Sequence, residues 1–383
     1  MRTYQAIAAS VLIASIAGIS AADGPVGWQE LPDTALMKVV PPNNFGGIKY
    51  DFHDHAAYVI NAWGGAAADT KRNRLIIWGG GHCDYYGNEV YALDLGATPA
   101  KMVRLTDPSP WDFAVSHQIN KDGSPVSRHT YNCLAYLPKE DRLLSFEGAT
   151  APNGSGGGYT FTLDLSVNPP KWQSMSPTKG FDPLKQMGSV CGAICAYDPN
   201  TDSVLYNDGN LFEFMRYTPS TNTWTKLTDY CESVVKAGSA VIDPKRKLMF
   251  FIGGAVQPCV MAVDISTGSK FTVQDWSSQV TGGEALTRAP YPGLVYDPGL
   301  DRIVGWPNTG DTVYLFNPDT KSFEALTYPN GPKAPGAIGT FGRFRYFPEL
   351  KAYAVVYAAD KNAFLLRLPA TIPASDANKQ AKK

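Results

Sequence analysis

The sequence LIIWGGGHCDYYGNEVYALDL at Leu75–Leu95 places two apolar runs on either side of a glycine-rich loop. The first run, Leu75–Trp78, ends at three consecutive glycines, which suit a turn that needs positive φ or a close backbone approach. The second run, Val90–Leu95, has the alternation of a strand. The stretch therefore predicts a β-hairpin, and the loop of this hairpin carries His82.

The hairpin is part of a repeat that runs through the chain. A short apolar segment that ends in proline occurs at Leu134–Pro138, Cys195–Pro199, Ala240–Pro244, Leu294–Pro298 and Phe344–Pro348, with a degenerate copy at Ala66–Thr70. A charged turn and a β-rich run follow each copy, at Arg74–Trp78, Arg142–Phe146, Ser203–Tyr206, Lys247–Ile252, Arg302–Trp306 and Ala352–Tyr357. A third run follows at Val90–Leu95, Tyr159–Leu165, Leu211–Tyr217, Val260–Ile265, Thr312–Phe316 and Ala363–Leu368. The chain thus contains six units of at least three antiparallel strands.

A fourth strand in each unit is marked by an aromatic or apolar residue with a second apolar residue shortly after it. The pattern occurs at Met102–Leu105, Trp172–Met175, Trp224–Leu227 and Phe323–Leu326, with a looser match at Trp276. The sixth unit ends near Leu368 without this strand, but Trp28–Leu31 at the other end of the chain fits the pattern. An N-terminal strand that completes the last unit would close a ring and remove two exposed sheet edges.

The repeat therefore predicts an all-β fold, a six-bladed β-propeller closed by its N-terminal strand. Seven blades remain possible if Lys38–Tyr58 contains a divergent unit. The order of apolar run, Gly-Gly, Tyr and Trp resembles that of Kelch-type propellers over almost the whole mature chain. This resemblance implies the fold but not the function, because Kelch propellers include enzymes, lectin-like binders and scaffolds.

The two ends of the chain are expected to lie outside the propeller. Arg2, the largely apolar run Ala6–Ile19 and small residues at 20–22 predict a signal peptide at residues 1–22, and hence a secreted or periplasmic protein. Residues 23–370 are expected to form a single propeller domain, and residues 371–383 a polar tail. No later apolar run is long enough to span a membrane. A net charge of −1 gives no indication of a nucleic-acid partner, and we expect a monomer.

Six cysteines in an exported chain predict disulfides, although the sequence does not choose among the pairings. Cys191 and Cys195 are four residues apart, but no second such pair follows, which argues against a zinc module. Cys83 beside His82 is expected to be a buried or disulfide-bonded thiol more often than a metal ligand.

The histidines of the chain all fall within one segment and are expected on one face of the propeller. Strands of a blade alternate in direction, so the start of a first strand and the end of a second strand lie on the same face. This places on one face, near the border of blades one and two, His53, His55, His82, His117 and His129. The long loops at Asp107–Ser127 and Gly154–Gly158 belong to these two blades, and elaborated loops on a rigid scaffold often carry function.

The candidate catalytic residues are His82, Arg128, His129 and Tyr131. His82 follows three glycines that let the backbone approach another segment closely, and His129 lies next to Arg128 and two residues before Tyr131.

The candidate substrate-binding residues are His55, Tyr85, Tyr86, Asn88 and Arg288. Asn88 and its neighbour Asp84 also suit a structural role in the hairpin turn. Arg288 has the same repeat position as Arg128, so both either line the central funnel or brace loops through carbonyls.

These residue types favour β-elimination at a uronic acid. Glycoside hydrolysis usually needs two positioned carboxylates, and no such pair is evident. In β-elimination a cation neutralises the carboxylate, a base removes the adjacent proton, and an acid protonates the departing oxygen. Arg128 would neutralise the substrate carboxylate, and His82 and His129 would exchange the protons. Tyr131 or Tyr86 could take the place of either histidine. No cofactor is firmly implied, and a bound divalent metal is compatible with these side chains.

Two motifs resemble those of secreted propeller polysaccharide lyases, notably the ulvan lyases. They are the Gly-Gly-Gly-His-x-Asp-Tyr-x-x-Asn-x-Val-Tyr order at Gly79–Tyr91 and Ser-Arg-His-Thr-Tyr at Ser127–Tyr131. The resemblance implies an acidic polysaccharide substrate and a site of histidines, a tyrosine and a neutralising arginine, which maps onto His82, His129 and Tyr131. This chain departs from the pattern at Phe146–Ala149, where an arginine is expected and none is present.

Two other interpretations remain open from the sequence. Exported six-bladed Kelch propellers of this length also resemble periplasmic sialic acid mutarotases, which act on an acidic sugar. A non-catalytic propeller that binds carbohydrate or protein is the second alternative. A copper-radical oxidase is disfavoured, because no set of metal ligands with a Tyr–Cys crosslink can be placed.

Overall fold

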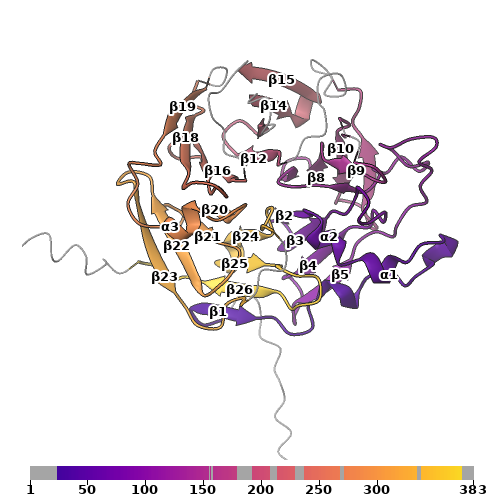
Figure 1. The fold of residues 1–383 in the computed structure, drawn as a ribbon, viewed down its shortest axis with the longest axis horizontal. Helices are drawn as coiled ribbons and strands as arrows, with labels where there is room; N and C mark the ends of the chain where they lie inside the picture. The colour runs from indigo at the N-terminus through magenta and orange to yellow at the C-terminus, as the bar shows by residue number, and fades with distance from the viewer. Residues whose placement is uncertain are drawn as a thin grey trace, which may run out of the picture.

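Each repeat folds into a four-stranded antiparallel sheet, and six such sheets surround a central axis (Figure 1). The computed structural model describes residues 24–154, 156, 158–178, 192–207, 214–228, 237–267, 271–333 and 338–372. The expected signal peptide and nearly all of the expected polar tail lie outside the described residues. The predicted six-bladed β-propeller is confirmed.

The strands lie close to their predicted positions. Blades one and two contain β2 (Gly65–Asp69), β3 (Arg74–Trp78), β4 (Tyr91–Asp94), β5 (Lys101–Arg104), β7 (Leu134–Leu137), β8 (Arg142–Ser145), β10 (Phe161–Asp164) and β11 (Lys171–Ser174). Blades three and four contain β12 (Ile194–Asp198), β13 (Ser203–Asn207), β14 (Phe214–Thr218), β15 (Thr223–Thr228), β16 (Ser239–Asp243), β17 (Leu248–Ile252), β18 (Val260–Asp264) and β19 (Thr272–Asp275). Blades five and six contain β20 (Gly293–Asp297), β21 (Arg302–Trp306), β22 (Thr312–Asn317), β23 (Ser322–Thr327), β24 (Phe344–Phe347), β25 (Ala352–Val355), β26 (Phe364–Arg367) and β1 (Gly27–Glu30). The looser match at Trp276 follows β19 instead of lying within it.

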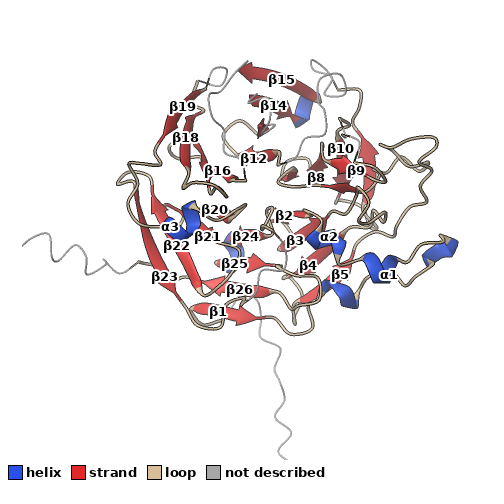
Figure 2. Cartoon of the chain, viewed as in Figure 1, coloured by secondary structure: helices blue, strands red, loops and turns tan. Residues whose placement is uncertain are grey.

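The segment that could have held a seventh blade forms short helices instead (Figure 2). These are η1 (Leu36–Lys38), η2 (Phe45–Gly47), α1 (Phe52–His55) and α2 (Tyr58–Asn61). The apolar side chains of this segment, including Leu36, Phe52 and Ile60, join the core between blades six and one. The described residues also contain the helical turns η4 (Pro219–Thr221), α3 (Glu284–Thr287) and η5 (Pro348–Leu350). The two-residue strands β6 (Arg128–His129) and β9 (Ala149–Thr150) pair with each other.

The core consists of six apolar layers, each between two neighbouring blades. Ile76 and Trp78 of blade one, for example, pack with Leu143 and Leu163 of blade two. Leu75 and Ile77, the alternate residues of the same strand, pack toward blade six. Both faces of each sheet are therefore buried, which explains why the second strands are continuous apolar runs.

Ion pairs connect neighbouring blades at the turns that follow the first strands. Arg72 contacts Asp69 of its own blade and Asp141 of blade two. The guanidinium of Arg72 holds the pKa of Asp141 well below its usual range. Arg246 makes the equivalent contacts to Asp243 and Asp301, one blade apart.

The expected disulfides are not seen in the part of the chain that the structure describes. Cys133, Cys195 and Cys259 are buried free thiols, and Cys83 is an exposed free thiol. Cys191 and Cys231 lie outside the described residues. Among the described residues, no helix has the length and apolar composition needed to cross a membrane.

The N-terminal strand closes the ring, as predicted. Residues Gly27–Glu30 pair antiparallel with Phe364–Arg367 of the last blade, and the indigo β1 lies beside the yellow β26 in Figure 1. Trp28 lies 5.9 Å from Trp306 and 6.4 Å from Phe364, measured between ring centroids. The indole N–H of Trp28 also donates a hydrogen bond to the Asp311 carbonyl at 3.1 Å.

Replacement of Trp28 by alanine should destabilise the whole ring, because the indole fills the layer between blades five and six. We expect Trp28→Ala to lower the free energy of unfolding by about 3–5 kcal/mol, as for other buried tryptophans. Tyr58, which is 41% exposed, provides the control. Urea unfolding followed by circular dichroism measures both variants, and equal losses for Trp28→Ala and Tyr58→Ala would contradict a closing role.

Candidate functional site

The loop after β3 packs directly against the backbone of blade two. Gly81 has a φ of +82°, and a Cβ atom at this position would lie 2.2 Å from the Cα of Arg128. Gly80, with a φ of +123°, similarly leaves room for the Ser127 side chain. The glycines of the hairpin therefore bring the His82 loop against β6, which carries His129.

The contact between the two loops brings together His82, Asp84 and His129. The imidazole rings of His82 and His129 are 5.6 Å apart and nearly perpendicular. The Nε2 atom of His129 lies 2.8 Å from Oδ2 of Asp84. On its other side, His82 faces Gly154, where a Cβ atom would lie 2.4 Å from the imidazole ring.

The electrostatic environment keeps His129 neutral near neutral pH. Only 3% of His129 is exposed, and this burial lowers the pKa of its imidazole. The hydrogen bond and charge of Asp84 oppose that effect, whereas the nearby His82 adds to it. With Nε2–H donated to Asp84, the lone pair of Nδ1 remains to accept a proton.

The same three side chains have the donor set of a divalent metal site. The ligand atoms of His82, Asp84 and His129 all lie within 4.8 Å of one another. Two imidazoles and a carboxylate are ligand types that zinc and other first-row divalent metals accept. The site could therefore work by proton transfer or hold a metal ion.

Two aromatic residues complete the site. Trp63 lies 4.9 Å and Tyr131 5.9 Å from His129 between ring centroids. Both residues have positive φ, 52° and 46°, and the Tyr131 N–H donates to the Trp63 carbonyl at 2.8 Å. Neither Trp63 nor Asp84 was among the sequence candidates. Trp63 could have been found from the repeat. It lies three residues before the apolar segment Ala66–Thr70, the position that Tyr131 has before Leu134–Pro138.

Arg128 points away from the site and braces the loops beneath it. Its side chain is fully buried and donates hydrogen bonds to the carbonyls of Val126 and Gln118, each at 3.2 Å. The guanidinium also lies 5.1 Å from the ring centroid of Phe161. Burial lowers the pKa of Arg128 to about 10, which the charge of Glu147 opposes, so it stays protonated at neutral pH. This placement agrees with the bracing alternative and not with direct contact to a substrate.

Two of the candidate binding residues are structural. Tyr85 is fully buried and donates its hydroxyl to Glu89. Asn88 is 2% exposed, and its amide donates to Ser124 at 2.9 Å and to the Pro125 carbonyl at 3.0 Å. These contacts attach the long loop of blade one to the hairpin.

The other candidates lie outside the histidine pair. Tyr86 stacks on Tyr50, with ring centroids 5.3 Å apart. His55 stacks on the same Tyr50 ring at 5.6 Å, so both belong to a partly exposed aromatic cluster that also contains Trp111 and Phe113. Arg288 is bound to Glu284 at 3.0 Å at the end of α3, which Figure 1 shows on the opposite side of the ring from α2. The structure therefore does not bring Arg288 to this site.

The remaining histidines are also away from the pair. His53 is exposed beside Asp54, at 3.6 Å. His117 stacks on Phe113 at 6.2 Å. Cys83 is exposed, with its Sγ 3.2 Å from the Pro152 carbonyl, and so is neither buried nor disulfide-bonded.

The six four-stranded sheets define the chain as a six-bladed β-propeller, and the two-loop site lies between its first two blades. No family model matches the sequence, and no curated protein matches it. The Kelch and ulvan lyase resemblances therefore rest on the motifs alone.

Three solved structures align with this chain over most of its length. The structure of YjhT aligns with a TM-score of 0.52 and 11% identity over 80% of this chain and 94% of that chain. A fungal alcohol oxidase of the AA5 family in complex with copper aligns with a TM-score of 0.47 and 14% identity, over 80% of this chain and 62% of that one. A chain of a mitotic checkpoint complex aligns with a TM-score of 0.47 and 11% identity, over 96% of this chain and 98% of that chain. At 11% identity the likeness to YjhT shows the fold alone, and function has to be argued from the site.

Substitution of Gly81 by alanine should force the two loops apart. We expect Gly81→Ala to lower the free energy of unfolding by about 3 kcal/mol or more, because the strain of positive φ adds to a backbone collision. Gly123 has a similar φ of +85° but open space around its Cβ position, so Gly123→Ala should cost only about 1 kcal/mol. Similar losses in urea unfolding of the two variants would show that the close approach is unimportant.

Proposed function

We propose that this propeller is an exported lyase that cleaves a uronic-acid-containing polysaccharide by β-elimination. The observation that carries the proposal is the hydrogen bond between His129 and Asp84, with His82 5.6 Å from His129. A buried, neutral histidine oriented by a carboxylate is the arrangement of a general base, and a second, more exposed histidine beside it can act as the acid.

The reaction assigns one proton transfer to each histidine. The Nδ1 atom of His129 takes the proton from the carbon next to the substrate carboxylate. The electron pair of that C–H bond forms a carbon–carbon double bond, and the bond to the glycosidic oxygen breaks. His82 acts as the acid and donates a proton to the departing oxygen. Tyr131, whose ring lies 5.9 Å from that of His129, could assist either transfer.

Arg128 acts in this proposal as a positioning residue. Its guanidinium touches carbonyls rather than the open side of the site. Its positive charge lies one residue from His129 in a buried environment, where electrostatic effects are less screened than at the surface.

The aromatic cluster beside the site supports a carbohydrate substrate. Tyr50, Tyr86, Trp111 and Phe113 are each partly exposed and contact one another at ring distances between 5.3 and 5.9 Å. Sugar rings present apolar faces that pack on such side chains. Tyr86 lies two residues from Asp84 in the same loop, so a chain bound over the cluster would extend to the histidines.

Removal of either histidine should abolish cleavage without unfolding the protein. With a panel of uronate-containing polysaccharides, we expect the wild-type protein to form the unsaturated uronate, followed by its ultraviolet absorbance. His82→Ala and His129→Gln should reduce the rate by about 10²–10⁴-fold. Surface His53→Ala should leave the rate unchanged. Binding of a polysaccharide without any absorbance change would leave a carbohydrate-binding propeller, and anomer or epimer exchange without cleavage would favour the mutarotase alternative.

The pH dependence should report the coupling between His129 and Asp84. Because the base must be neutral, kcat/KM should rise with pH through the lowered pKa of His129. Asp84 raises that pKa, so Asp84→Asn should move the rising limb to lower pH and also reduce the maximal rate. A chelator should leave the wild-type profile unchanged. A loss of activity that zinc restores would instead assign His82, Asp84 and His129 as metal ligands and contradict proton transfer by these histidines.

A further inference from the structure

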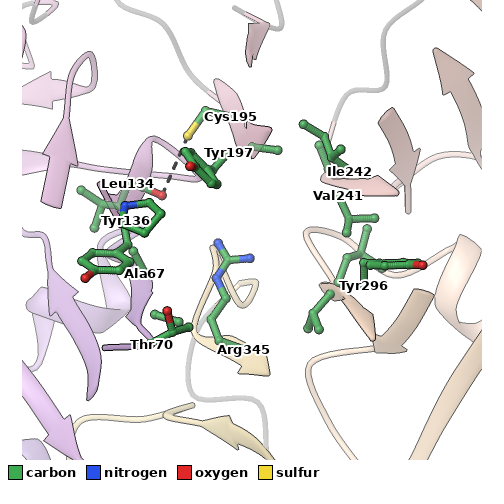
Figure 3. A pocket seen from close by; sticks show the side chains of 16 residues that line it. Ala67, Thr70, Leu134, Tyr136, Cys195, Tyr197, Val241, Ile242, Tyr296 and Arg345 are labelled. Carbon is green, nitrogen blue, oxygen red and sulfur yellow. Dashed lines mark hydrogen bonds between the residues drawn. The ribbon is translucent and has the colours of Figure 1, made fainter. Parts of the chain in front are cut away.

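The propeller axis contains a cavity of about 280 Å³ between the first strands of the six blades (Figure 3). Most of its wall is apolar, with side chains such as Leu134, Val241 and Leu294. Arg345 of β24 extends into this space in Figure 3. It is the single charged side chain among the described residues that line the cavity.

Arg345, which is partly buried, differs from the fully buried Arg343 in its contacts. Arg343 is fully buried, and its guanidinium donates to the carbonyls of Val356, Gly64 and Gly339. Arg345 makes one contact, from Nη2 to the Ala66 carbonyl at 3.5 Å, and forms no ion pair among the described residues. Burial lowers the pKa of Arg345, since no carboxylate offsets the cost of its charge. A planar guanidinium with unused donors in an apolar space is suited to bind a carboxylate in a bidentate manner.

The local backbone leaves room for this guanidinium. Gly342 has a φ of +80°, and a Cβ atom there would lie 2.5 Å from Nη2 of Arg345. A side chain at this position would therefore displace Arg345 from its place in the cavity.

On the side of the candidate catalytic site, aromatic rings cross the axis above the cavity. In each repeat, the residue three positions before the apolar segment of the first strand has positive φ. Four of these six residues are aromatic: Trp63, Tyr131, Tyr291 and Phe341. Tyr131 of blade two lies 6.2 Å from Phe341 of blade six, which lies 4.6 Å from Tyr291 of blade five. We call these four residues the aromatic collar.

The collar residues precede the first strands, so they lie at the end of the axis nearest the His82–His129 site. The hydroxyl of Tyr291 reaches within 3.4 Å of the Cβ position of Gly192, in blade three, so the collar spans the axis. The first strands run away from this face, and Thr70 and Pro138 line the cavity at the far ends of two of them. Four first strands end in a buried aspartate, and two of these, Asp69 and Asp243, pair with Arg72 and Arg246. The other two, Asp198 and Asp297, accept hydrogen bonds from backbone N–H groups and hydroxyls instead.

We propose that the axial cavity is a binding site for a small organic carboxylate, held by Arg345 and entered from the face opposite the candidate catalytic site. The carboxylate pairs with the guanidinium, and the apolar part of the ligand packs against the aliphatic side chains of the wall. The volume limits the ligand to a small molecule, well below the size of a polysaccharide. This inference does not depend on the proposed lyase activity.

Calorimetric titration of the full chain with benzoate and with inorganic phosphate tests the site. We expect the wild-type protein to bind benzoate more tightly than phosphate, because phosphate has no apolar part. Arg345→Met should weaken benzoate binding about tenfold or more, since a charge-assisted pair is lost. Arg345→Lys should weaken benzoate binding less than Arg345→Met, because lysine keeps the positive charge although it lacks the planar fork of the guanidinium.

The controls separate binding from folding. Arg302, which donates to the Asp301 carbonyl and does not line the cavity, provides a matched variant, and Arg302→Met should bind benzoate like the wild type. Arg345→Met should keep the wild-type melting temperature, because it removes a partly buried charge that has no ion-pair partner among the described residues. Absence of benzoate binding to the wild type, or equal affinity of the wild type and Arg345→Met, would overturn the proposal.

Discussion

The propeller depends on the antiparallel pairing of β1 with β26. Every sheet is buried on both faces, so each blade needs a neighbour on either side to cover its apolar side chains. A linear array of six sheets would leave two such faces exposed, and ring closure removes both. Because β1 comes from the start of the chain and the other three strands of its sheet come from the end, the last blade is complete only when the two ends meet. Trp28 contributes to this closure by filling the layer between blades five and six.

The candidate site depends on a second constraint, the close backbone approach of Gly81 to Arg128. This approach brings two loops from different blades into contact and sets His82 beside His129. His82 itself has a φ of 47°, a conformation that non-glycine residues seldom adopt. A strained conformation of this kind persists only where the surroundings hold it, and such residues cluster at functional sites. The packing of Gly154 on the other side of the His82 ring is one part of those surroundings.

The aromatic collar gives the two ends of the axis different chemistry. On one side, Trp63 and Tyr131 form part of the wall around His129. On the other side lies the axial cavity, in which Arg345 is the charged group of the described wall. The positive φ that recurs three residues before the first strand segment of each blade therefore shapes both the wall around His129 and that end of the axis.

The sequence by itself determined the blades, their order and the ring closure, because the spacing of apolar runs is a direct consequence of strands buried on both faces. Strand direction also predicted that His82 and His129 would lie on one face, near the border of blades one and two, since the end of β3 and the start of blade two lie on that face. Tertiary structure decided where the side chains of the loops point. Arg128 and Tyr85 are turned into the interior, Asp84 pairs with His129, and the collar crosses the axis. None of these follows from periodicity, because the direction of a loop side chain is set by positive-φ turns and by contacts with distant segments.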